Sequence, residues 1–154
     1  MWSKISAKRK KLEPNHTITS NIMGTDYQLY ISFPKNYSKR DRISYPVLCV
    51  LDGQYSFHSI LGSKDALDLT KSIEEVIIVA IGSGLDQKNW LKNRIYDYTP
   101  TINTARERTL EKLWGFAAGE LKSGGAIKFL QSLKTEIIPF IEKNYKTNAD
   151  RVIA

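Results

Sequence analysis

The sequence predicts an α/β protein in which an antiparallel hairpin precedes parallel strands with flanking helices. Three observations carry this prediction. Residues 16–33 alternate between polar and apolar side chains, as strands with one buried face do. Val47–Leu51 and Val76–Ile81 are uninterrupted apolar runs, which are typical of parallel strands covered by helices on both faces. Residues 126–145 place apolar side chains three or four positions apart, as an amphipathic helix does.

The hairpin is expected over His16–Ile22 and Asp26–Phe33, with Met23-Gly24-Thr25 as its turn. Pro34 follows the second strand and ends it, because proline cannot donate a hydrogen bond to a sheet. Residues 35–46 are then a polar connection to the first apolar run.

The two apolar runs and the segment between them predict a βαβ unit. His58–Lys71 is the expected crossover helix, and such crossovers are right-handed. Residues 82–104 are polar and too long for a simple connector, so we expect a loop that carries function or lacks order. Ligands of such sheets bind beyond the carboxyl ends of the strands, which here are Asp52–Tyr55 and Gly82–Gly84.

Two further helices are expected in the C-terminal third of the chain. Glu107–Leu121 is a weaker candidate, because Gly115 and Gly119 interrupt it. Ala126–Tyr145 is a stronger one, although Pro139 should kink or restart it. A polar turn over residues 146–150 then leads into Arg151–Ala154, which has the composition of the start of a buried strand.

Composition and charge indicate one domain, residues 16–154, after a basic N-terminal arm of residues 1–15. The net charge is +7, and residues 8–11 carry four adjacent positive charges. Such a cluster can contact nucleic acid or anionic lipid, but we expect a solvated arm and neither of these partners. No apolar run approaches the roughly 20 residues of a membrane span, and no signal peptide is recognisable. A cytoplasmic location is therefore expected, with a processed secreted form left open.

The residues that most often carry chemistry do not form a complete catalytic set. Cys49, the one cysteine, lies in an apolar run and is expected to be an inert packing residue. His16 and His58 lack the spacing of metal ligands, so neither a metal nor a cofactor is expected. Ser123 lacks the leading glycine and the preceding strand of a nucleophile elbow, and is expected to cap the helix near Ala126 or to lie in a loop.

Several segments, taken together with their order and spacing, are specific enough to indicate a protein family. They are YPVLCVLDGQYSF from Tyr45, VIIVAIG from Val76, NRIYDYTP from Asn93, GGAIKFL from Gly124 through IPFIEKNY from Ile138, and DRVIA from Asp150. This set resembles the esterase branch of the α/β-hydrolase superfamily, which includes esterase D, feruloyl esterases, ferric-siderophore esterases and mycolyltransferases. The resemblance covers about residues 16–154 and is strongest to the siderophore-esterase-like bacterial hydrolases.

The resemblance implies the N-terminal half of an α/β-hydrolase sheet and a serine-type carboxyl-ester hydrolase. Its substrate would be a small molecule, an acyl ester or a siderophore-lactone-like ester. In the family, the strand that matches Arg151–Ala154 runs directly into the Gly-x-Ser-x-Gly elbow, and the acid and the histidine come later. The 154 residues are therefore expected to be a fragment that lacks its nucleophile and is inactive alone. The alternative is a non-catalytic α/β binding or scaffold domain.

The same resemblance assigns roles around the end of the first parallel strand. The backbone N–H of Gln54 is expected to donate to the oxyanion, with Gly53 forming the turn. Tyr55 and Phe57 are expected either to line the acyl pocket or simply to pack the loop. For Asp52 we expect a structural role, accepting loop N–H groups, rather than acid catalysis.

Residues 93–100 match a family signature after the second parallel strand. Arg94 and Asp97 are expected to brace each other and fix that loop, while a direct role of Arg94 on a substrate carboxylate or catecholate is the alternative. Trp90 has the same two interpretations. If the chain ends at Ala154, Val47–Leu51 is expected to be an exposed sheet edge through which the chain self-associates.

Overall fold

The computed structural model describes residues 12–40, 42–84 and 86–154, and within them it forms one five-stranded sheet. The basic stretch of residues 8–11 lies outside the described residues. The strand order is β1-β2-β4-β3-β5. The strands are β1 His16–Ser20, β2 Thr25–Ser32, β3 Tyr45–Leu51, β4 Ile77–Ser83 and β5 Thr147–Ile153.

The pairing of the strands confirms the predicted mixed sheet. β1 and β2 form an antiparallel hairpin, and Gly24 in its turn has a φ of 66°, a conformation that glycine adopts without strain. β2 pairs with β4 antiparallel, whereas β3 pairs with β4 and with β5 in parallel. The hairpin is thus the antiparallel side of a sheet whose other strands are parallel.

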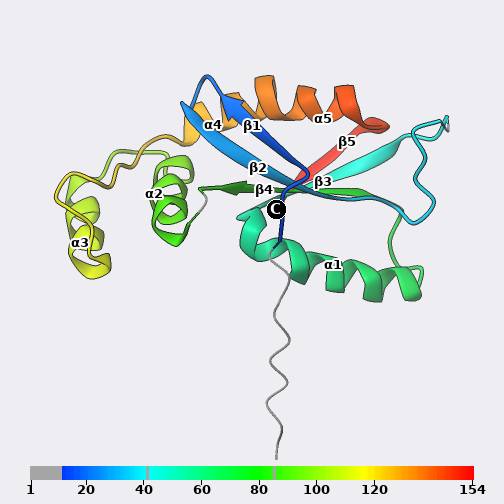
Figure 1. Cartoon of the computed structure of the whole chain (residues 1–154), viewed down its shortest axis with the longest axis horizontal. Helices are drawn as coiled ribbons and strands as arrows, with labels where there is room; N and C mark the ends of the chain where they lie inside the picture. Colours follow the sequence, from blue (N-terminus) through cyan, green and yellow to red (C-terminus); the bar gives the residue numbers. More distant parts are fainter. Residues whose placement is uncertain (1–11, 41, 85) are drawn as a thin grey trace, which may run out of the picture.

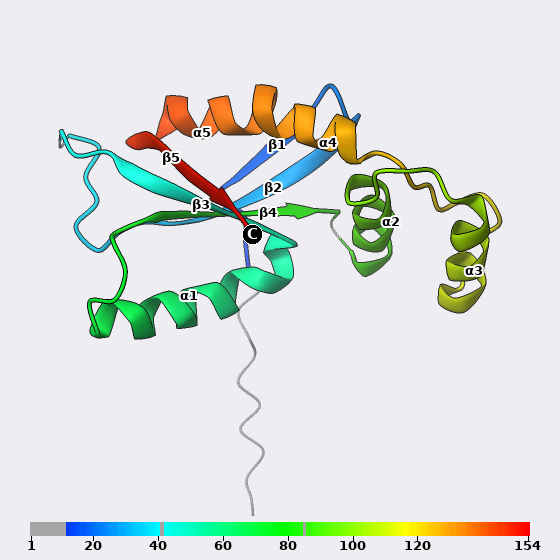
Figure 2. The ribbon, with the colours of Figure 1, turned by 180° about the vertical axis from the view of Figure 1, so that it is seen from behind.

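Helices cover both faces of this sheet (Figure 1). The helix α1, Gly53–Leu69, lies on one face and packs on a cluster that includes Tyr30, Phe57 and Ile78. The long helical segment before β5 lies on the other face, over a larger cluster that includes Leu29 and Ile137 (Figure 2). Among the described residues, no helix is both long enough and apolar enough to cross a membrane.

The helical segment before β5 is continuous but changes its winding before Pro139. It consists of α4 Ala126–Ser132, a π-helical turn η1 Leu133–Ile137, and α5 Ile138–Asn144. Pro139 has no N–H to offer to the preceding turn, and the backbone N–H of Ile138 instead bonds the carbonyl of Leu133. The predicted disturbance at Pro139 is therefore a π-helical turn.

The prediction of a loop over residues 82–104 is wrong in part. Gln87–Asp97 forms the helix α2, whose first turn is capped by the Asp86 carboxylate accepting from the N–H of Asn89 at 2.8 Å. The next helix, α3, is Thr104–Trp114 and ends earlier than predicted, because Gly115 takes the left-handed conformation with φ 69°. Both helices lie beyond the carboxyl end of β4 (Figure 1).

The expected exposure of β3 as a sheet edge is also wrong. β5 begins at Thr147, four residues before the predicted strand, and pairs with β3 along its length. Backbone bonds extend the pairing to the last residue, because Leu51 N donates to Ala154 O and Ala154 N to Cys49 O, both at 2.9 Å. The edge of the sheet is therefore β5, and the carboxyl ends of β3 and β5 lie side by side.

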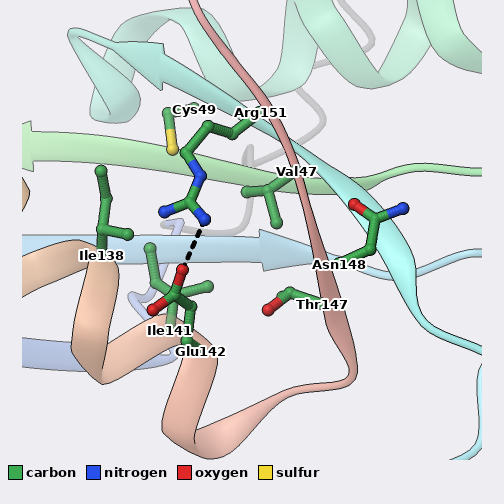
Figure 3. Close-up of a pocket in the computed structure, with 8 residues that line it drawn as sticks. All are labelled: Val47, Cys49, Ile138, Ile141, Glu142, Thr147, Asn148 and Arg151. Carbon is green, nitrogen blue, oxygen red and sulfur yellow. Dashed lines mark ion pairs between the residues drawn. The ribbon is translucent and has the colours of Figure 1, made fainter.

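The contact between β5 and α5 buries the cysteine. Figure 3 shows Cys49 and Arg151 side by side, and Arg151 reaches Glu142 of α5 at 2.6 Å. Burial of Cys49, which is 1% exposed, raises the pKa of its thiol to about 11, although the nearby Arg151 acts in the opposite direction. Cys49 is thus a protonated packing residue at neutral pH, as predicted.

Candidate functional site

The turn from β3 into α1 is pressed against the neighbouring strand. Asp52 lies at the junction in the left-handed conformation, with φ 55° and ψ 42°. At Gly53 a side-chain carbon would lie 2.7 Å from the carbonyl carbon of Ala80, which is closer than atoms can approach. Only glycine fits at this position, and α1 therefore begins directly on the backbone of β4.

The first turn of α1 offers a free backbone donor at Gln54. The N–H groups of Tyr55 and Ser56 both donate to the carbonyl of Asp52, at 2.9 and 3.0 Å. The N–H of Gln54 makes no hydrogen bond to any described residue. Such a donor at a helix N-terminus also carries the positive end of the helix dipole, so it favours negative charge.

The carboxylate of Asp52 is held by two side chains from α2. Trp90 Nε1 donates to one oxygen at 2.8 Å, and Arg94 Nε donates to the other at 2.9 Å. The backbone N–H of Asp52 also points to the hydroxyl of Tyr98, at a long 3.4 Å. These contacts agree with a structural role for Asp52, but its donors are side chains of α2 and not the loop N–H groups that we expected.

The expected brace between Arg94 and Asp97 does not form. Arg94 pairs with Asp52, whereas Asp97 is 3% exposed and accepts from the hydroxyl of Tyr27 at 2.8 Å. Burial raises the pKa of Asp97 to about 7, and the hydrogen bond from Tyr27 lowers it only in part. The two residues are three apart in α2, but one reaches the β3–α1 turn and the other reaches β2.

The aromatic residues near the turn divide between surface and core. Tyr55 is 52% exposed, and its ring lies 4.5 Å from that of Trp90. Arg94 lies over the Trp90 ring, with 5.9 Å to its centroid. Phe57 is 7% exposed and packs against Tyr30 beneath α1, so it belongs to the core and not to a surface pocket.

The side chain of Gln54 folds back over β4. Its Nε2 donates to the carbonyl of Ser83 at 3.0 Å, and its Oε1 is buried without a hydrogen-bond partner. The Oε1 atom occupies the space above Gly82, where a side-chain carbon would come within 2.5 Å of it. Gln54 therefore has a free N–H on one part of the residue and an unpaired carbonyl oxygen on another.

The other residues weighed as catalytic candidates lie on separate elements. Ser123 does not cap α4, because the cap position is Gly125 and has no side-chain bond. Its N–H and hydroxyl donate to the Glu107 carboxylate at 2.8 and 2.5 Å, in the loop after α3. His16 on β1 pairs with the Tyr145 hydroxyl at 2.5 Å, whereas His58 is an exposed residue within α1.

A protein-family model described as "Putative esterase" matches residues 20–154. The chain belongs to this esterase family. The Apo-salmochelin esterase of Escherichia coli O6:H1 is 29% identical to it over 139 residues. Among solved structures, the BES protein from Bacillus cereus superposes with a TM-score of 0.71 at 25% identity, and an IroE-like serine hydrolase from Shewanella oneidensis with 0.67 at 25%.

The members of the esterase family that match are longer than this chain. The match covers 88% of this chain but 40% of the E. coli esterase. It covers 95% of this chain and 55% of the B. cereus protein, and 90% and 40% for the S. oneidensis hydrolase. The chain thus spans about half the length of these relatives, and its sheet corresponds to part of their α/β-hydrolase fold.

Proposed function

We propose that this chain is the N-terminal part of a serine-type carboxyl-ester hydrolase that acts on a small-molecule ester, such as a siderophore-lactone-like one. The coverage of about half of each relative supports the first part. The names of the E. coli esterase and of the S. oneidensis serine hydrolase support the second. The nucleophilic serine, its histidine and its acid then belong to residues that follow Ala154. In this proposal residues 16–154 supply the oxyanion donor and one wall of the substrate site.

The observation that carries the proposal is the free N–H of Gln54. An ester carbonyl gains negative charge on its oxygen as the nucleophile attacks, and a fixed donor aimed at that oxygen lowers the barrier. Gln54 is fixed, because Gly53 rests on the backbone of β4 and Asp52 is held from α2. The carboxyl end of β5 lies beside this turn, since Leu51 bonds Ala154. A nucleophile that follows β5 would therefore emerge close to the donor.

The residues around the Gln54 N–H would contribute aromatic rings and a positive charge to the proposed substrate site. The ring of Tyr55 is exposed and lies beside the half-buried ring of Trp90, and Arg94 has a side chain that is 48% exposed. Because only the Nε of Arg94 donates to Asp52, its terminal nitrogens remain available for a carboxylate or catecholate of the substrate. Asp52 positions these two side chains and takes no proton in the reaction.

Substitutions at Gln54 test the donor in a protein that carries the nucleophile. Gln54→Ala keeps the N–H and should leave turnover of p-nitrophenyl acetate within a few-fold. Gln54→Pro removes it and should lower turnover by about 10²–10³. Ala105 is the second residue of α3, as Gln54 is of α1, and Ala105→Pro is the matched control for proline in a first helical turn.

The outcomes separate an enzyme from a scaffold. If alanine is as damaging as proline in folded protein, the side chain acts and the backbone assignment is wrong. If the protein with residues 16–154 and its C-terminal continuation hydrolyses no ester, the domain is a non-catalytic binding or scaffold domain. The 154-residue chain alone should hydrolyse the ester no faster than a denatured control.

A further inference from the structure

The end of α2 is anchored on the sheet by a carboxyl group. Asp97 is the one buried residue of α2, and it accepts a hydrogen bond from the hydroxyl of Tyr27 of β2 at 2.8 Å. The apolar side chains of α2 point elsewhere, because Leu91 and Ile95 pack on a cluster that includes Leu110 of α3. The contact between α2 and β2 therefore depends on a hydrogen bond and not on an apolar face.

Trp90, Arg94 and Asp97 lie on one face of α2. They are four and three residues apart, a spacing that brings side chains to the same side of a helix. Trp90 and Arg94 hold the two carboxylate oxygens of Asp52, at 2.8 and 2.9 Å. A rise of about 1.5 Å per residue places Asp97 only about 4.5 Å along the helix axis from Arg94. A movement of α2 at Asp97 would therefore displace both donors of Asp52.

Tyr98, the residue that follows α2, connects the same two places. Its hydroxyl lies 3.4 Å from the backbone nitrogen of Asp52, and the guanidinium of Arg94 lies 5.4 Å from the centre of its ring. Its ring also packs against Phe129, and Phe129 packs against Tyr27, with ring centres 5.5 and 5.6 Å apart. The contacts at Tyr27 and at Asp52 thus belong to one packed unit.

We propose that Asp97 is a positioning residue, which holds α2 so that Trp90 and Arg94 stay on Asp52. Asp97 touches neither the substrate nor the reacting atoms. It acts through Arg94, whose exposed side chain faces the proposed substrate site. The effect on an ester rests on the proposed function, whereas the position of Trp90 can be measured without one.

Ionisation of Asp97 should weaken this anchor. Burial raises the pKa of Asp97 from 3.8 to about 7, since its carboxylate loses hydration and receives one compensating bond from Tyr27. The anion therefore favours an arrangement in which the end of α2 moves toward water. The difference between the two pKa values corresponds to a shift of up to about 10³-fold in the balance between the two positions of α2.

The titratable and charged groups around Asp97 come from four parts of the fold. They are Tyr27 of β2, Arg94 and Tyr98 in and after α2, Asp52 of the β3–α1 turn, and Glu136 of η1. Burial raises the pKa of both tyrosines above the ordinary value. At Glu136 burial acts to raise the pKa, but hydrogen bonds hold it below the ordinary value. The loss of a pH effect in Asp97→Asn assigns that effect to Asp97.

The indole N–H of Trp90 reports the position of α2 in the 154-residue chain. Three tryptophans give three indole resonances in an NMR spectrum, and Trp90→Phe identifies the one of Trp90. This resonance should shift as the pH rises, with a midpoint near 7. In Asp97→Asn, which cannot ionise, it should stay in place, and the N–H should exchange with solvent about tenfold more slowly than in the unsubstituted chain at pH 8.

Two further variants separate positioning from general stability. Tyr27→Phe should move the midpoint to higher pH, because the bond that it removes favours the anion. Asp86→Ala removes the cap at the other end of α2, so it should lower Tm but leave the midpoint unchanged. A shift that persists in Asp97→Asn overturns the proposal. A shift without faster exchange than in Asp97→Asn overturns it too, because the contact of Trp90 with Asp52 would then survive ionisation.

Kinetics in a protein that also carries the nucleophile test the consequence for Arg94. Between pH 6 and pH 8.5 the KM for the anionic ester p-nitrophenyl hemisuccinate should rise about fivefold, while the KM for neutral p-nitrophenyl acetate stays within about twofold. Asp97→Asn should abolish the rise. Equal rises for both esters would contradict a role through Arg94. If neither ester is hydrolysed, the proposed function fails, and the spectra of Trp90 still decide whether Asp97 positions α2.

Discussion

Two carboxylates attach the β1–β2 hairpin to helices, and their environments differ. Glu136, in the π-helical turn, accepts hydrogen bonds from the hydroxyls of Ser20 and Ser132 and from the N–H groups of Asn21 and Ile22. Asp97, at the end of α2, is the more deeply buried of the two and accepts one hydrogen bond, from Tyr27 of β2. Both contacts are long-range, and both end on the same hairpin.

The difference shows that the number of donors decides whether a partly or fully buried carboxylate stays ionised. At Glu136 burial acts to raise the pKa, but the hydrogen bonds from Ser20, Ser132, Ile22 and Asn21 together outweigh it and hold the pKa below its ordinary value. At Asp97 burial prevails over the single bond from Tyr27, and the pKa rises to about 7. Glu136 therefore stabilises the fold as an anion, whereas the contribution of Asp97 to stability is greatest when its carboxyl group is protonated.

Removing the Glu136 carboxylate should have the largest effect on stability. In Glu136→Ala the hydroxyls of Ser20 and Ser132, both 0% exposed residues, lose their shared acceptor, and the turn N–H groups lose theirs. We expect a loss of about 2–4 kcal/mol in the free energy of unfolding, measured by urea titration. Glu142→Ala, which removes only the more exposed pair with Arg151, should cost about 1 kcal/mol or less. Equal losses in the two variants would contradict this account.

The two carboxylates should give opposite pH dependences of stability. The folded pKa of Asp97, about 7, lies above its ordinary value of 3.8, so the folded state binds the proton more tightly. Its contribution is fully present below about pH 4 and is lost as the pH rises through 7. The folded pKa of Glu136 is lowered, so its contribution is present above about pH 4.5 and is lost at more acidic pH.

Asp97→Asn and Glu136→Gln test this pair of slopes by thermal melts between pH 3 and pH 9. Asp97→Asn should remove the fall in Tm between roughly pH 4 and pH 7, because its amide does not titrate. Glu136→Gln should leave that fall in place and reduce the loss of stability below about pH 4.5. A fall between pH 4 and pH 7 that persists in Asp97→Asn would mean that another group causes it.

The smallest effect is expected from Tyr27→Phe. The ring keeps its packing against Phe129, but Asp97 loses its one hydrogen bond to a side chain of β2. We expect a loss of about 1 kcal/mol, and the pKa of Asp97 should move further upward, because the bond from Tyr27 favours the anion. The fall in Tm should therefore shift to higher pH. A shift to lower pH would show that the hydroxyl stabilises the neutral acid instead.

Local sequence was sufficient to predict the strands β1 to β4. The alternation of polar and apolar side chains predicted the hairpin. The uninterrupted apolar runs predicted β3 and β4, because a strand that helices cover on both faces carries apolar side chains on both faces. α2 was missed because it is a polar helix with Asp97 as its one buried residue, so it has no apolar stripe for a periodic pattern to show. The Asp86 cap with Asn89 three residues later was the available signal of its start.

The hydrogen-bond and ion-pair partners of the polar side chains, in contrast, depended on the tertiary structure. The spacing of Arg94 and Asp97 suggested that they pair, but the position of α2 turns one toward Asp52 and the other toward Tyr27. Glu107 and Glu111 have the spacing of an exposed helix face, yet they are 8% and 4% exposed and accept from N–H groups of the loop after α3.

The sequence by itself therefore determined the strands β1 to β4, the long helical segment before β5, the esterase family, and the glycine turn that carries Gln54. The tertiary structure decided that β5 and not β3 is the sheet edge, that Phe57 is a core residue, and that Arg94 pairs with Asp52 and not with Asp97. The physical reason is that periodicity reports how a segment buries its own side chains. Hydrogen-bond partners and free donors depend on which segments, distant in sequence, the sheet brings together.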